Sequence, residues 1–324
     1  MTIAVLLLIA VLAAANGAND VSKGVATLRG SGLARYRTAI LWGAVTTLAG
    51  SLLSAALASN MLKVFTGGAI TRPPTVPFEA AALCGVVAWI VVATVLRLPV
   101  STTHGLIGAL IGAGLLFAPS AIAWNAIVSR LLVPLLASIV VAYAISAIAN
   151  AIERRVLAGR PHSDAPAPRS LLGIDGLHWL SAGGVGFARG LNDTPKIVSL
   201  GVAVHTVGVI WLFVLVAVAM FAGSLVAGSR VAKVLAEELV TMNHREGFTA
   251  NLTTALLVGF GANLGLPMST THVSTGAIAG IGGGDTNRLN KETVVKLLIA
   301  WTVTPVFAAV VAALAYFLLT HLAL

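Results

Sequence analysis

Apolar residues fill ten long segments of the chain, and short polar stretches separate these segments. The segments cover approximately residues 2–26, 38–60, 79–97, 99–118, 125–149, 174–203, 206–228, 247–265, 267–284 and 294–320. Most of them approach the roughly 20 residues that an α-helix needs to cross a bilayer. The pattern therefore predicts an all-α polytopic membrane protein. Segments 99–118 and 267–284 are short, begin at or beside a proline and are rich in glycine, so each is either a tilted broken span or a re-entrant hairpin.

The composition supports a protein that lies almost entirely in the lipid bilayer. Of its 324 residues, 58% are hydrophobic and 10% are charged, whereas a soluble domain has about a quarter charged residues. Cys84 is the only cysteine, which excludes an internal disulfide and a cysteine metal cluster. A net charge of +9 would suggest nucleic acid in a soluble protein, but here we expect basic cytoplasmic loops and no nucleic-acid partner.

The basic residues indicate how the chain is threaded through the membrane. They follow four of the segments, as Arg29, Arg35 and Arg37, then Arg154, Arg155, Arg160 and Arg169, then Arg230, Lys233 and Arg245, then Arg288 and Lys291. If every segment crosses once, all four loops lie on one side. The positive-inside rule makes that side the cytoplasm and places both termini outside a plasma or inner cell membrane. If segment 99–118 alone re-entered, the loop 154–169 would face outward. We therefore expect ten crossings, five in each half.

Two motifs recur in the same order in both halves. Residues 17–23 (GANDVSK) return as 190–196 (GLNDTPK), and residues 98–104 (LPVSTTH) return as 266–272 (LPMSTTH). With five crossings in each half, the second half enters the membrane in the opposite direction. The sequence thus predicts two inverted repeats, residues 1–150 and 174–324, joined by a cytoplasmic linker over 151–173. Inverted repeats with interrupted helices at equivalent positions are typical of secondary transporters whose site lies near the membrane midplane.

The paired Ser-Thr-Thr triplets predict an anion site. Each triplet follows a proline and precedes a glycine-rich apolar run, so it lies at a helix N-terminus, where free backbone N–H groups and the helix dipole favour an anion. Two such starts facing each other would surround a tetrahedral oxyanion with donors. The alternative is that Ser101 and Ser269 are only N-caps. The expected anion ligands are Ser101, Thr102, Thr103, Ser269, Thr270 and Thr271.

The paired Asn-Asp motifs interrupt apolar segments with charge. Glycine, asparagine, aspartate and Pro195 weaken a helix, so we expect a break at each motif. Asp20 and Asp193 are costly inside a membrane and are therefore expected to be functional. Lys23 and Lys196 lie three residues further on and can pair with them. The carboxylates, with Asn19, Asn192 and exposed carbonyls, can instead bind a cation such as Na⁺.

Two kinds of residue beside these motifs have more than one interpretation. His104 and His272 end the Ser-Thr-Thr motifs, and either carry protons or support the helix start, which we favour. Arg189 precedes the second Asn-Asp motif, where the first half has Asn16. It is either an asymmetric anion contact or a residue of a vestibule that faces the cytoplasm.

These paired motifs resemble those of the inorganic phosphate transporter family, and the resemblance covers essentially the whole chain. It implies an inverted-repeat transporter with a central phosphate site, driven by Na⁺ or H⁺ and often oligomeric, with no other cofactor. It also implies ion and phosphate binding by Asn19, Asp20, Asn192 and Asp193. The family often has asparagine at the position of Lys23, whose fixed charge makes H⁺ coupling or a single ion site more plausible here.

Some short members of the family are sulfate permeases, so sulfate is the alternative substrate. A carboxylate that accepts a hydrogen bond in the pocket favours phosphate, because sulfate has no proton to donate at neutral pH. An anion channel is a further alternative. We expect no enzyme, because an intramembrane hydrolase needs one nucleophile beside one base, whereas this chain repeats the whole set.

Overall fold

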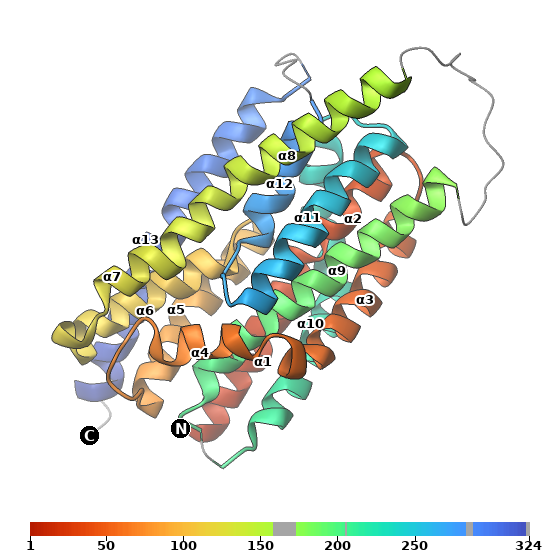
Figure 1. Cartoon of the computed structure of the whole chain (residues 1–324). Coiled ribbons are helices and arrows are strands. Elements are labelled where there is room, and N and C mark those ends of the chain that lie inside the picture. Colours follow the sequence, from red (N-terminus) through yellow and green to blue (C-terminus); the bar gives the residue numbers. More distant parts are fainter. Residues whose placement is uncertain (158–172, 205, 283–287, 322–324) are drawn as a thin grey trace.

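The computed structural model describes residues 1–157, 173–204, 206–282 and 288–321, and Figure 1 shows their long helices packed into one bundle. Most of the predicted linker, residues 158–172, lies outside the described residues. The helices are α1 (Thr2–Asp20), α2 (Ser22–Gly30), α3 (Tyr36–Leu57), α4 (Ser59–Gly67), α5 (Val76–Val95), α6 (Thr102–Phe117), α7 (Trp124–Ala126), α8 (Val133–Leu157), α9 (Ile174–Val198), α10 (Val209–Lys233), α11 (His244–Leu264), α12 (Thr270–Gly280) and α13 (Lys291–His321). Short 3₁₀ or π segments follow α6, α7, α9 and α10.

The lengths and compositions of the helices confirm a multi-pass membrane protein. Within the described ranges, six helical stretches are long and apolar enough to cross a bilayer: Thr2–Gly30, Tyr36–Leu57, Val76–Val95, Trp124–Val156, Val209–Glu238 and Lys291–His321. Helix α9 also runs along the bundle, but it contains Arg189, Asp193 and Lys196.

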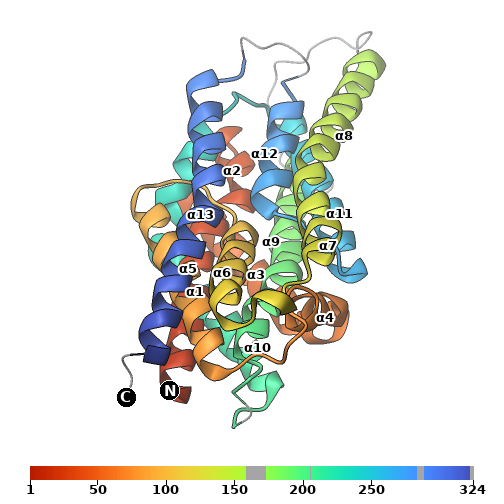
Figure 2. The same cartoon turned by 90° about the vertical axis from the view of Figure 1, so that its left-hand side faces the viewer.

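Two pairs of helices, α5–α6 and α11–α12, form hairpins whose tips touch each other through Thr271 and Val100, as the re-entrant interpretation of segments 99–118 and 267–284 predicts. The segment before α5 pairs with the segment after α6, through an antiparallel bridge between Ile70 and Ile122. The segment before α11 pairs in the same way with the segment after α12, through Val240 and Leu289. Each hairpin therefore returns to the end of the bundle from which it started, and the two hairpins enter from opposite ends (Figure 2).

The two halves repeat one architecture in opposite directions, as predicted. Helices α1 and α2 correspond to α9, α3 to α10, the hairpin α5–α6 to the hairpin α11–α12, and α8 to α13. The start of α1 and the end of α13 lie at the same end of the bundle (Figure 2). A hairpin and a pair of crossings both return the chain to the side it came from, so the basic loops still share one end.

Ion pairs hold the described basic loops together at the end opposite the termini. Arg154 from α8 and Arg288 from the loop before α13 both contact Glu246 at the start of α11, with N–O distances of 3.1 and 2.9 Å. Arg29 at the end of α2 approaches Glu237 at 3.6 Å. These contacts connect segments from both halves at one face of the bundle.

Each half packs its first long helix against the second long helix of the other half, and we call this arrangement exchanged packing. Helix α1 lies against α10, and its counterpart α9 lies against α3. Both contacts depend on equivalent glycines: a Cβ added at Gly17 would lie 2.1 Å from the Met220 carbonyl oxygen, and one at Gly190 would lie 2.4 Å from that of Thr47. Because small residues allow helix backbones to approach closely in a membrane, the repeated glycines fix this exchanged packing.

The second arm of each hairpin packs in the same exchanged manner. Helix α6 lies against α13 and α12 against α8. A Cβ at Gly108 would lie 2.1 Å from the Pro305 carbonyl oxygen, and a Cβ at the equivalent Gly276 would lie 2.5 Å from that of Ile139.

Replacing Gly108 by Ala is therefore expected to lower the free energy of unfolding by about 1–3 kcal/mol or more, the usual cost of overpacking. Gly259→Ala is the matched control, because its Cβ would meet only the Ala188 Cβ at 3.6 Å while gaining the same helix propensity. Thermal unfolding of the purified variants in detergent measures both effects. Equal melting temperatures for the two variants would contradict the exchanged packing.

The breaks predicted at the Asn-Asp motifs are much weaker than expected. In the first half the helix is interrupted only at Val21, which keeps right-handed helical angles. In the second half α9 continues through Pro195 to Val198 and only then tightens into a 3₁₀ turn. The larger interruptions in the backbone lie at the hairpin tips, residues 96–101 and 265–269.

Candidate functional site

The two hairpin tips have the same backbone construction. Leu98 N–H bonds to the Ala93 carbonyl and Leu266 N–H to that of Gly261, closing a Schellman turn at the end of α5 and of α11. The left-handed residue of this turn is Gly265 in the second hairpin, with φ 70°, and Arg97 in the first, with φ 61°. The repeat therefore extends to the turn that reverses the chain.

Each tip then begins its second helix with a serine N-cap. Ser101 Oγ accepts a hydrogen bond from His104 N–H at 3.3 Å, and Ser269 Oγ accepts one from His272 N–H at 3.2 Å. Both serine hydroxyls therefore act as N-caps, which was the alternative to their binding an anion. The N–H groups of the two threonines that precede each histidine have no acceptor within their helices, so these two helix starts retain donors for a ligand.

The two tips meet in the middle of the bundle. Thr271 Oγ1 donates to the Val100 carbonyl at 2.6 Å, and the ring centroids of His104 and His272 lie 4.6 Å apart. The structure thus brings together the two Ser-Thr-Thr motifs, from hairpins that enter at opposite ends of the bundle.

The first Asn-Asp motif lies beside the first tip. Lys23 Nζ forms a salt bridge with Asp20 and also contacts Val100 O at 3.0 Å and Asn19 Oδ1 at 3.4 Å. Asn19 in turn holds the tip, because its side chain bonds to the Leu98 carbonyl and to the Val100 N–H. The Lys23 ammonium therefore lies among a carboxylate, an amide and a backbone carbonyl oxygen.

The second Asn-Asp motif has an equivalent arrangement at the second tip. Lys196 Nζ lies 3.3 Å from Asp193 Oδ1, 3.0 Å from Met268 O and 2.8 Å from Thr103 Oγ1. Met268 occupies in the second tip the position that Val100 has in the first. Asn192 again bonds to the tip, through the Met268 carbonyl and Thr270 Oγ1.

Asn16 is a central residue that the motif analysis did not include in the site. Its Nδ2 lies 2.8 Å from Thr102 Oγ1, 3.2 Å from Asp20 Oδ2 and 3.4 Å from Asp193 Oδ2. It therefore connects both aspartates to the first hairpin. The signal in the sequence was its place four residues before Asp20 on an apolar helix, which puts both side chains on one face.

Arg189 replaces Asn16 in the second half and is the least satisfied group of the site. Its side chain is 1% exposed, and its charge interacts with Asp20 and Asp193. Nevertheless, among the described residues Nε, Nη1 and Nη2 have no hydrogen-bond partner. A buried guanidinium that makes no hydrogen bond is costly, so Arg189 offers a strong and unused set of donors.

The buried cluster carries an excess of positive charge. Asp20, Asp193, Lys23, Lys196 and Arg189 are all at most 2% exposed. With both histidines neutral, these three cations and two carboxylates leave one positive charge. We call these five residues, with Asn16, Asn19, Asn192 and the threonines of the two tips, the tip cluster.

The histidines that end the Ser-Thr-Thr motifs lie against the tip cluster. His272 Nδ1 is 3.2 Å from the Leu135 carbonyl, and its ring lies 4.2 Å from that of Trp301. Within the described ranges, His104 Nδ1 and His272 Nε2 have no hydrogen-bond partner. The Leu135 contact and the ring packing fit the expected support of the helix start.

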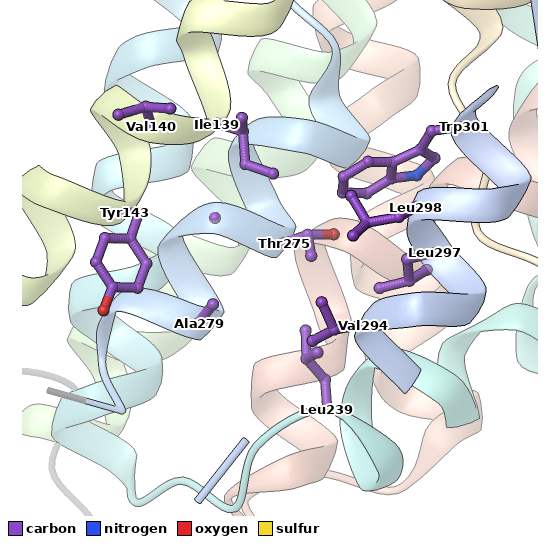
Figure 3. Close-up of a pocket in the computed structure, with 11 residues that line it drawn as sticks. Ile139, Val140, Tyr143, Leu239, Thr275, Ala279, Val294, Leu297, Leu298 and Trp301 are labelled. Atoms are coloured by element: carbon purple, nitrogen blue, oxygen red, sulfur yellow. The ribbon is translucent and has the colours of Figure 1, made fainter. Parts of the chain in front are cut away.

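A separate cavity of about 280 Å³ is unsuited to a charged ligand. It lies between α8, α12 and α13, lined by residues such as Ile139, Tyr143, Thr275, Leu297 and Trp301. Figure 3 shows mainly apolar side chains around it, and no residue of the tip cluster lines it. This cavity is therefore separate from the tip cluster.

Comparison with known proteins agrees with the duplicated architecture. The sequence profile of the phosphate transporter family matches residues 16–171 and again residues 160–312. The chain also resembles a solved structure described as the sodium-dependent phosphate transporter, with a TM-score of 0.81 and 21% identity over 98% of each chain. At this identity the likeness shows the fold.

Two curated relatives extend the comparison. A probable low-affinity inorganic phosphate transporter of Mycobacterium bovis is 29% identical over 315 residues, covering 93% of this chain and 73% of the relative. A protein of the same description from Rhizobium meliloti is 27% identical, covering 93% of this chain and 91% of the relative.

Proposed function

The chain belongs to the phosphate transporter family, and from this premise we propose that it is a secondary transporter that carries inorganic phosphate across a cell membrane. The observation that supports this function best is Arg189, a buried guanidinium without a hydrogen-bond partner in the described ranges, whose charge interacts with the two aspartates of the tip cluster. Arginine and helix starts are both typical ligands of phosphate.

In this proposal the anion binds between the hairpin tips. Arg189 binds two of its oxygens, and the first-turn N–H groups of α6 and α12 bind the others. The threonine hydroxyls of both tips take part once the anion displaces their present partners, such as Asn16 for Thr102 and Lys196 for Thr103. Ser101 and Ser269 fix the helix starts. The ligand thus replaces internal hydrogen bonds of the tip cluster.

Charge and protonation favour phosphate over sulfate. One positive charge of the tip cluster is neutralised by dihydrogenphosphate, whereas a dianion leaves the buried site negative, which is costly. Dihydrogenphosphate also has O–H groups to donate to Asp20 or Asp193. Sulfate has no such proton and would place its oxygens against carboxylates.

The opposed hairpins suggest how the site opens to each side in turn. The tip cluster is buried, and each hairpin covers it from one end of the bundle. Moving α5–α6 would open the site to the end that carries the termini, and moving α11–α12 would open it to the basic end. We place the basic end in the cytoplasm and both termini outside, by the positive-inside rule.

Uptake of radiolabelled phosphate into proteoliposomes tests the function. With an imposed pH gradient, we expect phosphate to accumulate above equilibrium, and a hundredfold excess of unlabelled sulfate to leave the initial rate nearly unchanged. Inhibition by sulfate to background would make the protein a sulfate permease. Rapid uptake that only equilibrates the anion would indicate a channel.

A further inference from the structure

The solved structure of similar fold is described as the sodium-dependent phosphate transporter. This description raises the question of whether the residues of the tip cluster can bind Na⁺. Na⁺ binds oxygen atoms such as carboxylates, side-chain amides and backbone carbonyls. The tip cluster contains two such oxygen sets, one beside each hairpin tip. The four residues expected to bind Na⁺, Asp20, Asp193, Asn19 and Asn192, all lie in or next to these sets.

Both oxygen sets already hold a cation that belongs to the chain. In the first half, the Lys23 ammonium contacts the Asp20 carboxylate, the Asn19 amide oxygen and the Val100 carbonyl. In the second half, the Lys196 ammonium contacts one oxygen each of Asp193, Met268 and Thr103. Both lysine side chains are 0% exposed.

The equivalence of the two sets shows that the ammonium groups are part of the architecture. Val100 and Met268 occupy the same position in the two Ser-Thr-Thr motifs, and Lys23 and Lys196 the same position in the two Asn-Asp motifs. Each ammonium thus connects the aspartate of a long helix to the carbonyl of its own hairpin tip. A bound cation with oxygen ligands would make the same connection.

The charge of the cluster gives an independent argument against a resident Na⁺. Three buried cations already exceed the two carboxylates. An additional Na⁺ without an additional anion would leave two uncompensated positive charges in a buried site, and uncompensated buried charge costs several kcal/mol per ion. The residues present therefore do not fit Na⁺.

We propose that Lys23 and Lys196 are tethered cations that take the place of Na⁺ at both hairpin tips, so that phosphate transport by this chain is independent of Na⁺. This inference rests on the proposed function. It leaves the proton as the coupling ion.

Initial rates of phosphate uptake into proteoliposomes test the proposal when all Na⁺ is replaced by choline. We expect the rates with and without Na⁺ to agree within a factor of two under the same pH gradient. Uptake that falls to background in choline would overturn the proposal while upholding phosphate transport. Absence of uptake in both media would instead refute the proposed function and, with it, this inference.

Emptying one oxygen set gives a second test. In Lys196→Gly, we expect uptake to be lost and then partly restored by millimolar methylammonium, whose ammonium group can enter the vacated set. Lys63→Gly, an exposed lysine of α4, is the control and should match the wild type with and without the amine. Full activity of Lys196→Gly without amine would contradict the tethered cation.

A measurement on the wild type covers the case in which the glycine variant does not fold. Thermal unfolding of the phosphate-free protein should show the same melting temperature in NaCl as in choline chloride at equal ionic strength. A stabilisation specific to Na⁺ and saturable in its concentration would show a resident Na⁺ site and overturn the proposal.

Discussion

Replacing Arg189 by Met is expected to abolish phosphate uptake and, at the same time, to stabilise the phosphate-free protein. The guanidinium is 1% exposed and none of its nitrogens is hydrogen-bonded within the described ranges. Its removal leaves two lysines and two aspartates, a neutral cluster. Substituting buried ionic groups by apolar side chains of similar size often stabilises a protein by about 1–4 kcal/mol. Uptake assays and thermal unfolding without phosphate measure the two effects.

Arg189→Lys is the matched variant, since it keeps the charge but loses the planar fork that binds two oxygens. We expect its phosphate affinity to fall roughly 10- to 100-fold, which corresponds to about 1.4–2.7 kcal/mol. The variant should not gain the stability of Arg189→Met. If Arg189→Met transported phosphate with unchanged affinity, Arg189 would not be an anion ligand.

Replacing Asp20 by Asn is expected to reduce phosphate uptake to background and to destabilise the protein. The Lys23 ammonium would lose its buried carboxylate partner. Removing one member of a buried ion pair costs roughly 3–5 kcal/mol. Asp193→Asn should act in the same way through Lys196. Uptake in proteoliposomes, normalised to the amount of folded protein, measures the first effect, and thermal unfolding measures the second.

The double variant Asp20→Asn with Lys23→Gln separates the loss of folding from the loss of transport. It removes both charges of the pair, so stability should return toward that of the wild type. Uptake should remain at background, because the first oxygen set has lost its cation and its carboxylate. Recovery of uptake together with stability would show that the pair is needed only for folding.

The inverted repeat could be predicted from the sequence because each motif has a second copy in the same chain. Two short motifs recur in the same order in both halves, and the structure places equivalent residues, such as Val100 and Met268, in equivalent contacts. The pairing of each aspartate with the lysine three residues later was also predictable, since helical geometry places both on adjacent positions of one face.

The hairpins could not be distinguished from crossings by the charges of the loops. A hairpin and two successive crossings both return the chain to its starting side, so the basic loops lie at one end in either case. The distinguishing contact lies between the two hairpin tips, where Thr271 bonds to the Val100 carbonyl, and it joins residues that are far apart in the sequence. The sequence has no local signal for such pairing.

The breaks at the Asn-Asp motifs are weaker than predicted because the prediction used only the low helix propensity of the residues in each motif. Asn19, Asp20 and Pro195 disfavour a helix in isolation, but in the bundle they lie in helices held by close packing, with Gly17 and Gly190 against neighbouring backbones. Tertiary contacts, the commonest source of helical stability in proteins, are not visible in propensity. Asn16 escaped notice for a similar reason, since its contacts with Thr102 and Asp193 are long-range.

A crystal structure with arsenate, a phosphate analogue whose anomalous scattering locates the ion, would show where the anion binds. We expect a tetrahedral ion between the tips of α5–α6 and α11–α12, within hydrogen-bond distance of the Arg189 guanidinium and of the first-turn N–H groups of α6 and α12. An ion bound elsewhere, with Arg189 still unpaired and the two tips still in contact, would contradict this expectation.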